Sequence, residues 1–75
     1  MEKGESALKA IREALGMTQR QMADRLLTTD TTIYRWESGR SPATFTIAQA
    51  KALSNLLKPL SLTIEQLPDD LGPAK

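Results

Sequence analysis

The chain has 75 residues and a net charge of +1, with 40% hydrophobic and 25% charged residues, which is the composition of one small globular domain. It contains no cysteine and no histidine, which excludes disulfides and thiolate or imidazole metal sites and removes the commonest general base. We therefore expect no enzymatic activity, no metal and no cofactor, and, because no apolar segment is long enough for a signal core or a membrane span, a cytoplasmic protein.

Residues 6–15 have the pattern of an amphipathic helix. Leu8, Ile11 and Leu15 recur at helical spacing, with charged residues between them. Gly16 follows at a position where a helix can end in the left-handed conformation. We therefore predict a first helix over residues 6–15, with the three apolar side chains facing the core.

A second helix is predicted from Gln19. Thr18 is placed to cap its N-terminus, and Gln21, three residues later, completes the pattern of a capping box. The helix is expected to be short, because threonines follow it at once. Its buried stripe is formed by Met22, Ala23 and Leu26.

The stretch TTDTTIYRWESGR has the composition of a β-strand, since branched and aromatic side chains favour a pleated surface. A strand, however, would mix polar and apolar side chains on both of its faces, so neither face could join a core. A helix that begins at Asp30, with Thr29 as N-cap, places Ile33 and Trp36 on one face. Gly39 then lies where a left-handed residue ends a helix. We therefore predict a third helix.

Two further helices are predicted after Pro42. The segment ATFTIAQAKALSNLLK carries an apolar stripe at helical spacing, made of Phe45, Ala48, Ala52 and Leu56. Thr63 and Gln66 then repeat the capping-box pattern, which predicts a short fifth helix that ends before Pro68.

These elements predict an all-α fold with a single core. We divide the chain into an N-terminal arm (residues 1–5), a compact five-helix domain (6–67) and a frayed C-terminal tail (68–75). Two short helices joined by a turn make up a central helix-turn-helix unit at about residues 18–38. The predicted core consists of Leu8, Ile11, Leu15, Met22, Ala23, Leu26, Ile33, Trp36, Phe45, Ala48, Ala52 and Leu56.

Residues 8–67 resemble the phage-repressor-like, Xre-type helix-turn-helix family, also described as lambda-repressor-like. The resemblance is carried by a leading helix, the segment TQRQMADRL, and the segment TTIYRWESGRSP at a fixed spacing from it. One departure is Leu27, because the family usually has Gly or Asn near this position, where the chain turns between the two helices. A non-glycine residue is acceptable there if its backbone stays outside the left-handed region.

The resemblance implies a set of DNA-contacting residues. The third helix would lie in the major groove of double-stranded DNA, and the base-reading residues would be Thr29, Asp30, Thr31 and Arg35. Contacts to the sugar-phosphate backbone would come from Gln19, Thr28, Tyr34, Arg40, Ser41 and Thr44. Each of these polar side chains is also compatible with an ordinary solvated surface. For Asp30, a contact to cytosine and simple stabilisation of the helix end are equally good interpretations.

The resemblance also implies a structural salt bridge between Arg12 and Glu37, which would tie the first helix to the end of the third. Four leucines near the fifth helix have two interpretations, because they can form a dimer contact or close the domain core. They are Leu57, Leu60, Leu62 and Leu67.

The resulting functional hypothesis is a small, repressor-like transcriptional regulator that binds a specific DNA sequence as a homodimer. Residues 1–58 contain nine Lys or Arg and six Asp or Glu, whereas residues 59–75 contain one and three, so the acidic end is expected to face away from DNA. The alternative is a protein-interaction module, such as an antitoxin-like chain that binds a protein partner. The near-neutral net charge keeps this alternative open, because non-specific DNA affinity depends on cationic contacts.

Overall fold

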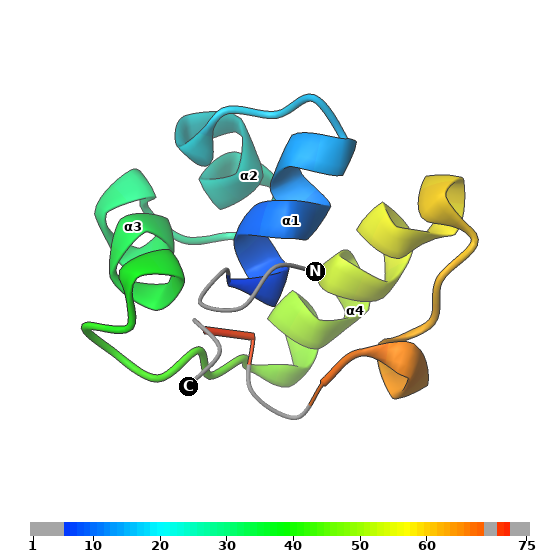
Figure 1. The fold of residues 1–75 in the computed structure, drawn as a ribbon. Coiled ribbons are helices and arrows are strands. Elements are labelled where there is room, and N and C mark those ends of the chain that lie inside the picture. The colour runs from blue at the N-terminus through cyan, green and yellow to red at the C-terminus, as the bar shows by residue number, and fades with distance from the viewer. Residues whose placement is uncertain (1–5, 69–70, 73–75) are drawn as a thin grey trace.

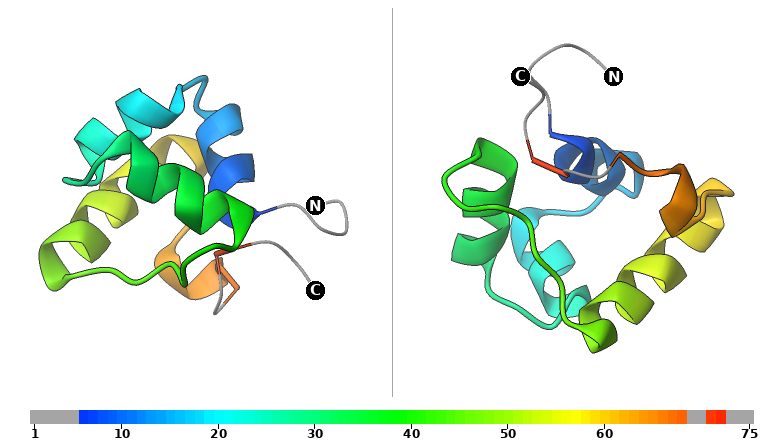
Figure 2. Two further views of the ribbon diagram at one scale, coloured as in Figure 1. Left: turned by 90° about the vertical axis from the view of Figure 1, so that its left-hand side faces the viewer. Right: turned by 90° about the horizontal axis from the view of Figure 1, so that it is seen from below.

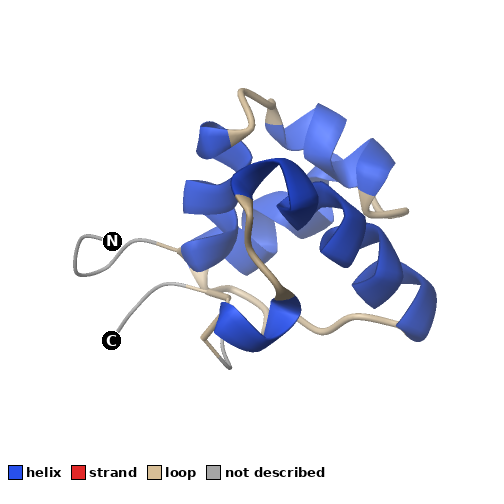
Figure 3. Cartoon of the chain, turned by 90° about the vertical axis from the view of Figure 1, so that its right-hand side faces the viewer, coloured by secondary structure: helices blue, strands red, loops and turns tan. Residues whose placement is uncertain are grey.

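A computed structural model describes residues 6–68 and 71–72 of the chain. Within them lie four α-helices, namely α1 (Ala7–Ala14), α2 (Gln19–Arg25), α3 (Asp30–Ser38) and α4 (Ile47–Leu57). Two short 3-10 turns follow, η1 (Lys58–Leu60) and η2 (Ile64–Gln66). All regular elements of this described part are helical (Figures 1 and 3). No helix in it is long and apolar enough to cross a membrane.

Capping residues set the starts of the first three helices, and those of α2 and α3, Thr18 and Thr29, are the ones that the sequence predicts. Ser6 caps α1, and the hydroxyl of Thr18 accepts a hydrogen bond from the backbone N–H of Gln21 at the start of α2. Thr29 caps α3 through its bond from Thr32, and Gly39 ends that helix with a φ angle of 80°. The prediction of a helix rather than a strand for this stretch is confirmed, because local capping and helical periodicity outweigh the strand preference of its side chains.

α1 lies between α3 and α4 in Figure 1, and α2 packs beside α3. The hydrophobic side chains that these helices bury are Ala7, Leu8, Ile11, Met22, Ala23, Leu26, Ile33, Trp36, Leu53, Leu56, Leu57 and Leu71. Leu15, Phe45 and Ala52 are partly buried against this core. Of the predicted core residues, only Ala48 is exposed, and its assignment to the core is wrong.

The start of α4 explains the exposure of Ala48. The fourth helix was expected to begin soon after Pro42, but it begins at Ile47, because Thr46 and Gln49 form a capping box. The capping box places Ala48 in the first turn of α4, where its side chain faces solvent. The buried stripe of α4 is therefore shifted toward its C-terminus, to Leu53, Leu56 and Leu57.

The predicted fifth helix is also corrected, because the segment forms only the single 3-10 turn η2. The capping signal is present, since the N–H of Thr63 donates to Oε1 of Gln66 at 2.8 Å. Only four residues separate Thr63 from Pro68, and the residue before a proline is disfavoured in a helix. Leu67 is accordingly extended, with φ −82° and ψ 151°.

The four leucines of this region face the domain core. Leu57 is fully buried, and Leu60, Leu62 and Leu67 are partly buried against the core. Of the two interpretations given above, the structure thus supports closure of the core. A dimer contact by these side chains remains a prediction.

The chain beyond Pro68 is not a free tail at Leu71. The side chain of Leu71 is buried, and its carbonyl accepts hydrogen bonds from the Ser6 hydroxyl at 2.7 Å and the Leu8 N–H at 3.1 Å. The prediction of a frayed end is therefore wrong at this residue, because one apolar side chain and two hydrogen bonds hold it against α1. The predicted arm over residues 1–5 and the rest of the predicted tail, residues 69–70 and 73–75, lie outside the described residues.

Candidate nucleic-acid interface

α2, the turn after it and α3 form a helix-turn-helix, and α3 lies on the outside of the domain. In the left view of Figure 2, α3 is at the front and no described element covers it. Ile33 and Trp36 point inward and are buried, and Trp36 packs edge-on against Phe45 with ring centroids 5.0 Å apart. The inner face of α3 is thus fixed by packing, which leaves its outer face available to a ligand.

The turn between α2 and α3 adopts a left-handed conformation at Leu27, whose φ angle is 60°. The condition under which a non-glycine residue is acceptable there is therefore not met. The N–H of Thr28 donates to the carbonyl of Ala23 at 2.9 Å, a bond typical of helix ends that use a left-handed residue. Leu27 is 64% exposed, so it gains little from packing that would offset its backbone strain.

The predicted base-reading residues are exposed, but they are not equally free. Asp30, Thr31 and Arg35 all lie on the solvent side of α3. Oδ1 of Asp30 accepts the N–H of Thr31 at 2.8 Å, and the Thr29 hydroxyl bonds both the N–H and the hydroxyl of Thr32. Thr29 and Asp30 therefore stabilise the first turn of α3, whatever else they contact.

The predicted backbone-contacting residues lie along α2, α3 and the following loop. Tyr34, Arg40 and Thr44 are exposed, whereas Thr28 and Ser41 are half-buried. The guanidinium carbon of Arg40 lies 6.0 Å from the centre of the Tyr34 ring, at the outer limit of a cation–π contact. The structure thus brings Tyr34 and Arg40 together at the surface.

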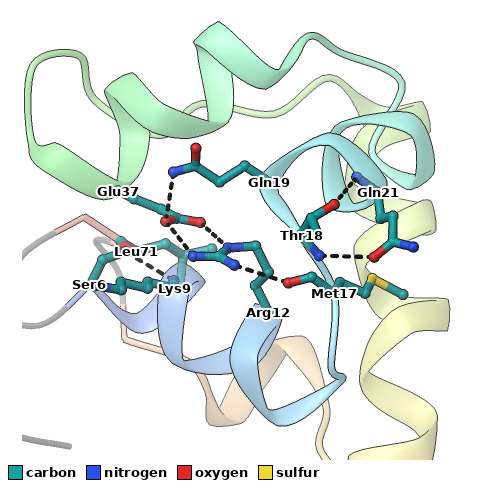
Figure 4. Close-up of polar contacts among 9 residues, drawn as sticks. All are labelled: Ser6, Lys9, Arg12, Met17, Thr18, Gln19, Gln21, Glu37 and Leu71. Carbon is teal, nitrogen blue, oxygen red and sulfur yellow. Dashed lines mark hydrogen bonds and ion pairs between the residues drawn. The ribbon is translucent and has the colours of Figure 1, made fainter.

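The predicted salt bridge between Arg12 and Glu37 is present. Nε of Arg12 donates to Oε2 of Glu37 at 2.8 Å, and Nη2 donates to Oε1 at 3.1 Å (Figure 4). The hydrogen bond to Glu37 raises the pKa of Arg12, with a smaller contribution from the charge of the same carboxylate, while burial acts in the opposite direction. The bridge ties α1 to the end of α3 and stabilises the charged form of Arg12.

Gln19 belongs to the same cluster of side chains. It is half-buried, and its Nε2 donates to Oε1 of Glu37 at 3.2 Å. The sequence places Gln19 at the start of α2 as a phosphate contact, but it gives no sign of this bond across 18 positions of the chain. The structure therefore adds a partner to Gln19 that the sequence pattern did not indicate.

A comparison with known protein families gives a match to a helix-turn-helix family model over residues 8–64, which runs from α1 into η2. The chain belongs to this Xre-type, lambda-repressor-like helix-turn-helix family. No curated protein and no solved structure matches the chain. Family membership supports a DNA-binding helix-turn-helix regulator.

In this helix-turn-helix protein, two exposed cations on α2, Arg20 and Arg25, were not predicted as DNA contacts from the sequence. Arg20 lines a surface hollow at the junction of α2 and α3, together with Thr28, Thr29 and Asp30. The positions of Arg20 and Arg25 in the first and last turns of the predicted second helix, outside its buried stripe, could have indicated that both side chains are exposed. No group of three or more acidic side chains that could hold a metal ion occurs among the described residues.

Proposed function

We propose that the chain binds a specific sequence in double-stranded DNA, with α3 in the major groove, and that it acts as a small transcriptional repressor. The observation that carries this proposal is the division of α3 into two faces. Ile33 and Trp36 are buried, whereas Asp30, Thr31 and Arg35 are exposed. A helix with one face anchored in the core and the other uncovered and polar is what major-groove binding requires.

The dimensions and chemistry of α3 support this placement. An α-helix with its side chains is about 10–12 Å in diameter, which matches the major-groove width of about 12 Å, and the nine residues of α3 extend roughly 13 Å along its axis. Within the described residues, no carboxylate forms a salt bridge with Arg35. Its guanidinium is therefore available to donate two hydrogen bonds to O6 and N7 of guanine, the commonest specific contact in this groove.

The surroundings of α3 supply the proposed contacts to the DNA backbone. We assign this role to Gln19, Thr28, Tyr34, Arg40, Ser41 and Thr44, and we add Arg20, which borders the same junction of α2 and α3. The exposed arginines of this region are cations that can replace counterions along the phosphates. We further propose a cytoplasmic homodimer on a palindromic site, with half-sites about 34 Å apart.

Selection of bound sequences from a random duplex pool tests the proposal directly. The wild-type chain should enrich one motif, and Arg35→Ala should lose preference at one base pair of each half-site. Lys51→Ala, which removes an exposed cation from α4, serves as the control and should enrich the wild-type motif. If Arg35→Ala also enriches the unchanged motif, Arg35 does not read a base.

The alternative is a protein-interaction module, such as an antitoxin-like chain, and it is favoured by the net charge of only +1. A salt titration of binding to random duplex separates the two functions. Affinity for DNA should fall steeply as salt concentration rises, because binding releases counterions from the phosphates. Failure to bind any duplex at low salt would favour the interaction module instead.

A further inference from the structure

Glu37 forms the centre of a polar cluster that joins three helices. Its side chain is 5% exposed, and its carboxylate accepts two hydrogen bonds from Arg12 and one from Gln19. Arg12 also donates through Nη1 to the carbonyl of Met17 at 2.9 Å, directly before the start of α2 (Figure 4). The N-terminus of α2 is thus held to α1 and α3 at two points, the Met17 carbonyl and the Gln19 side chain.

The bond to Glu37 determines which end of the Gln19 amide faces the cluster. A carboxylate only accepts hydrogen bonds, so the amide nitrogen must face Glu37 and the amide oxygen must point away. Figure 4 shows this arrangement, with the nitrogen of Gln19 directed at Glu37. The amide nitrogen carries two hydrogens, and the bond to Glu37 uses one of them. The second remains available to an acceptor outside the cluster.

Arg12 removes the electrostatic cost of this arrangement. A carboxylate near the start of α2 would repel a phosphate, but the guanidinium of Arg12 lies 2.8 Å from it and balances its charge. Glu37 can therefore direct the amide of Gln19 without opposing the binding of an anion. A buried ion pair with no net charge positions a side chain more than it stabilises the fold, because desolvation of the two charges offsets much of their attraction.

We propose that Glu37 is a positioning residue for DNA binding, which fixes the Gln19 side-chain amide so that its free N–H donates to a phosphate of the DNA backbone. This inference rests on the DNA-binding function proposed above. It assigns Glu37 a role in the interface although its side chain is almost buried and does not itself contact the ligand.

A double-mutant cycle measures whether Glu37 acts through Gln19. The paired substitution Arg12→Met with Glu37→Met removes the partner of Gln19 without leaving a buried charge or altering the net charge, and such apolar replacements commonly preserve a fold. We expect Gln19→Ala to weaken binding to the selected duplex about tenfold, as loss of one hydrogen bond to a charged group predicts. The paired substitution should weaken it similarly, and the triple variant by no more than about twofold beyond either.

The control is the paired substitution Lys58→Met with Glu65→Met, which is also charge-neutral and removes two exposed side chains outside the cluster. It should change the affinity less than about twofold, as surface substitutions usually do. If the losses of Gln19→Ala and the Arg12 and Glu37 pair multiply in the triple variant, Glu37 has a structural role independent of Gln19. Wild-type protein that binds no duplex would instead overturn the proposed function, and this inference with it.

An NMR measurement on the wild-type protein keeps the inference testable if the paired variant does not fold. In the free protein, one side-chain amide proton of Gln19 should show a nuclear Overhauser effect to an Hη2 proton of Arg12, since both groups donate to Oε1 of Glu37. On addition of duplex, the other amide proton should shift more strongly. Absence of the Overhauser effect in the free protein would show that Glu37 does not hold Gln19, whether or not the chain binds DNA.

Discussion

Leu27 offers a direct test of the turn between α2 and α3. Its φ angle of 60° lies in the region where a Cβ atom meets the following carbonyl oxygen, at a cost of about 1–2 kcal/mol. Glycine has no Cβ and does not incur this cost. We predict that Leu27→Gly is more stable than Leu27→Ala, although alanine is otherwise the better residue near a helix.

The comparison of these two variants isolates the free-energy cost of the left-handed backbone at residue 27. Leu27 is 64% exposed, and both substitutions remove the same packing contribution from its covered part, so that contribution cancels. The remaining difference is about 1–2 kcal/mol of strain in the alanine variant, reduced by about 0.5–1 kcal/mol for the greater unfolded-state freedom of glycine. The glycine variant should therefore be more stable by about 0.5–1 kcal/mol, or roughly 2–8 °C in Tm for a domain of this size.

Urea and thermal denaturation followed by circular dichroism measure this difference. The matched control is Lys51, an exposed residue inside α4, where Lys51→Gly should be less stable than Lys51→Ala by about 1 kcal/mol. The order of glycine and alanine should thus reverse between the two sites. If Leu27→Ala equals or exceeds Leu27→Gly in stability, the turn does not use a left-handed residue at this position.

Three further predictions concern the salt bridge, the C-terminal contact and pH. Glu37→Ala should lower the free energy of unfolding by about 2 kcal/mol or more, because it leaves Arg12 without its carboxylate. The control Glu13→Ala, at an exposed position, should change that free energy by less than about 0.5 kcal/mol. Equal thermal midpoints for the two variants would show that the Arg12–Glu37 salt bridge does not hold the fold. Leu71→Ala should lower the free energy of unfolding by about 2–3 kcal/mol. Ile47→Ala, at a site 77% exposed, should lower it by less than about 0.5 kcal/mol. Equal urea midpoints for the two variants would show that Leu71 is not part of the core. The thermal midpoint should stay nearly constant between about pH 6 and 9, because no side chain has an ordinary pKa there. The raised pKa of Arg12 adds stability that is fully present below the pKa of Arg12 in the unfolded chain and is lost only in strong alkali. A change in the thermal midpoint between about pH 6 and 9 would therefore contradict the view that no titrating side chain affects folding there.

The parts of the fold that the sequence predicted are those decided by neighbouring residues. Thr18 and Gln21 are three positions apart, and Thr29 and Gly39 bracket α3, so their effect on helix ends does not depend on the rest of the chain. The same local reasoning was available at Thr46, which begins α4, but the apolar stripe running through Phe45 suggested an earlier start. Periodicity finds a helix, whereas capping decides where it begins.

The missed features depend on contacts between distant residues. Leu71 is held by Ser6 across 65 positions, and no pattern within a short segment marks that contact. The bond from Gln19 to Glu37 likewise depends on the rotamers of two side chains that α1 and Arg12 bring together. The candidate DNA contacts were implied by the family resemblance and stay predictions, whereas no sequence pattern indicated the hydrogen bonds that orient them.

The hydrogen bonds at the start of α3 restrict which side chains are able to select a DNA sequence. The hydroxyl of Thr29 and one carboxylate oxygen of Asp30 already bond the first turn of α3, so each has less capacity left for a base. Asp30 keeps one oxygen; if it contacts a base, this oxygen would accept from the N4 amine of cytosine, whereas a carboxylate would be repelled by phosphate. Arg35 is exposed and free of any salt bridge in the described structure. We therefore expect Arg35 to contribute most of the specificity, with Asp30 acting mainly by excluding bases that offer it no donor.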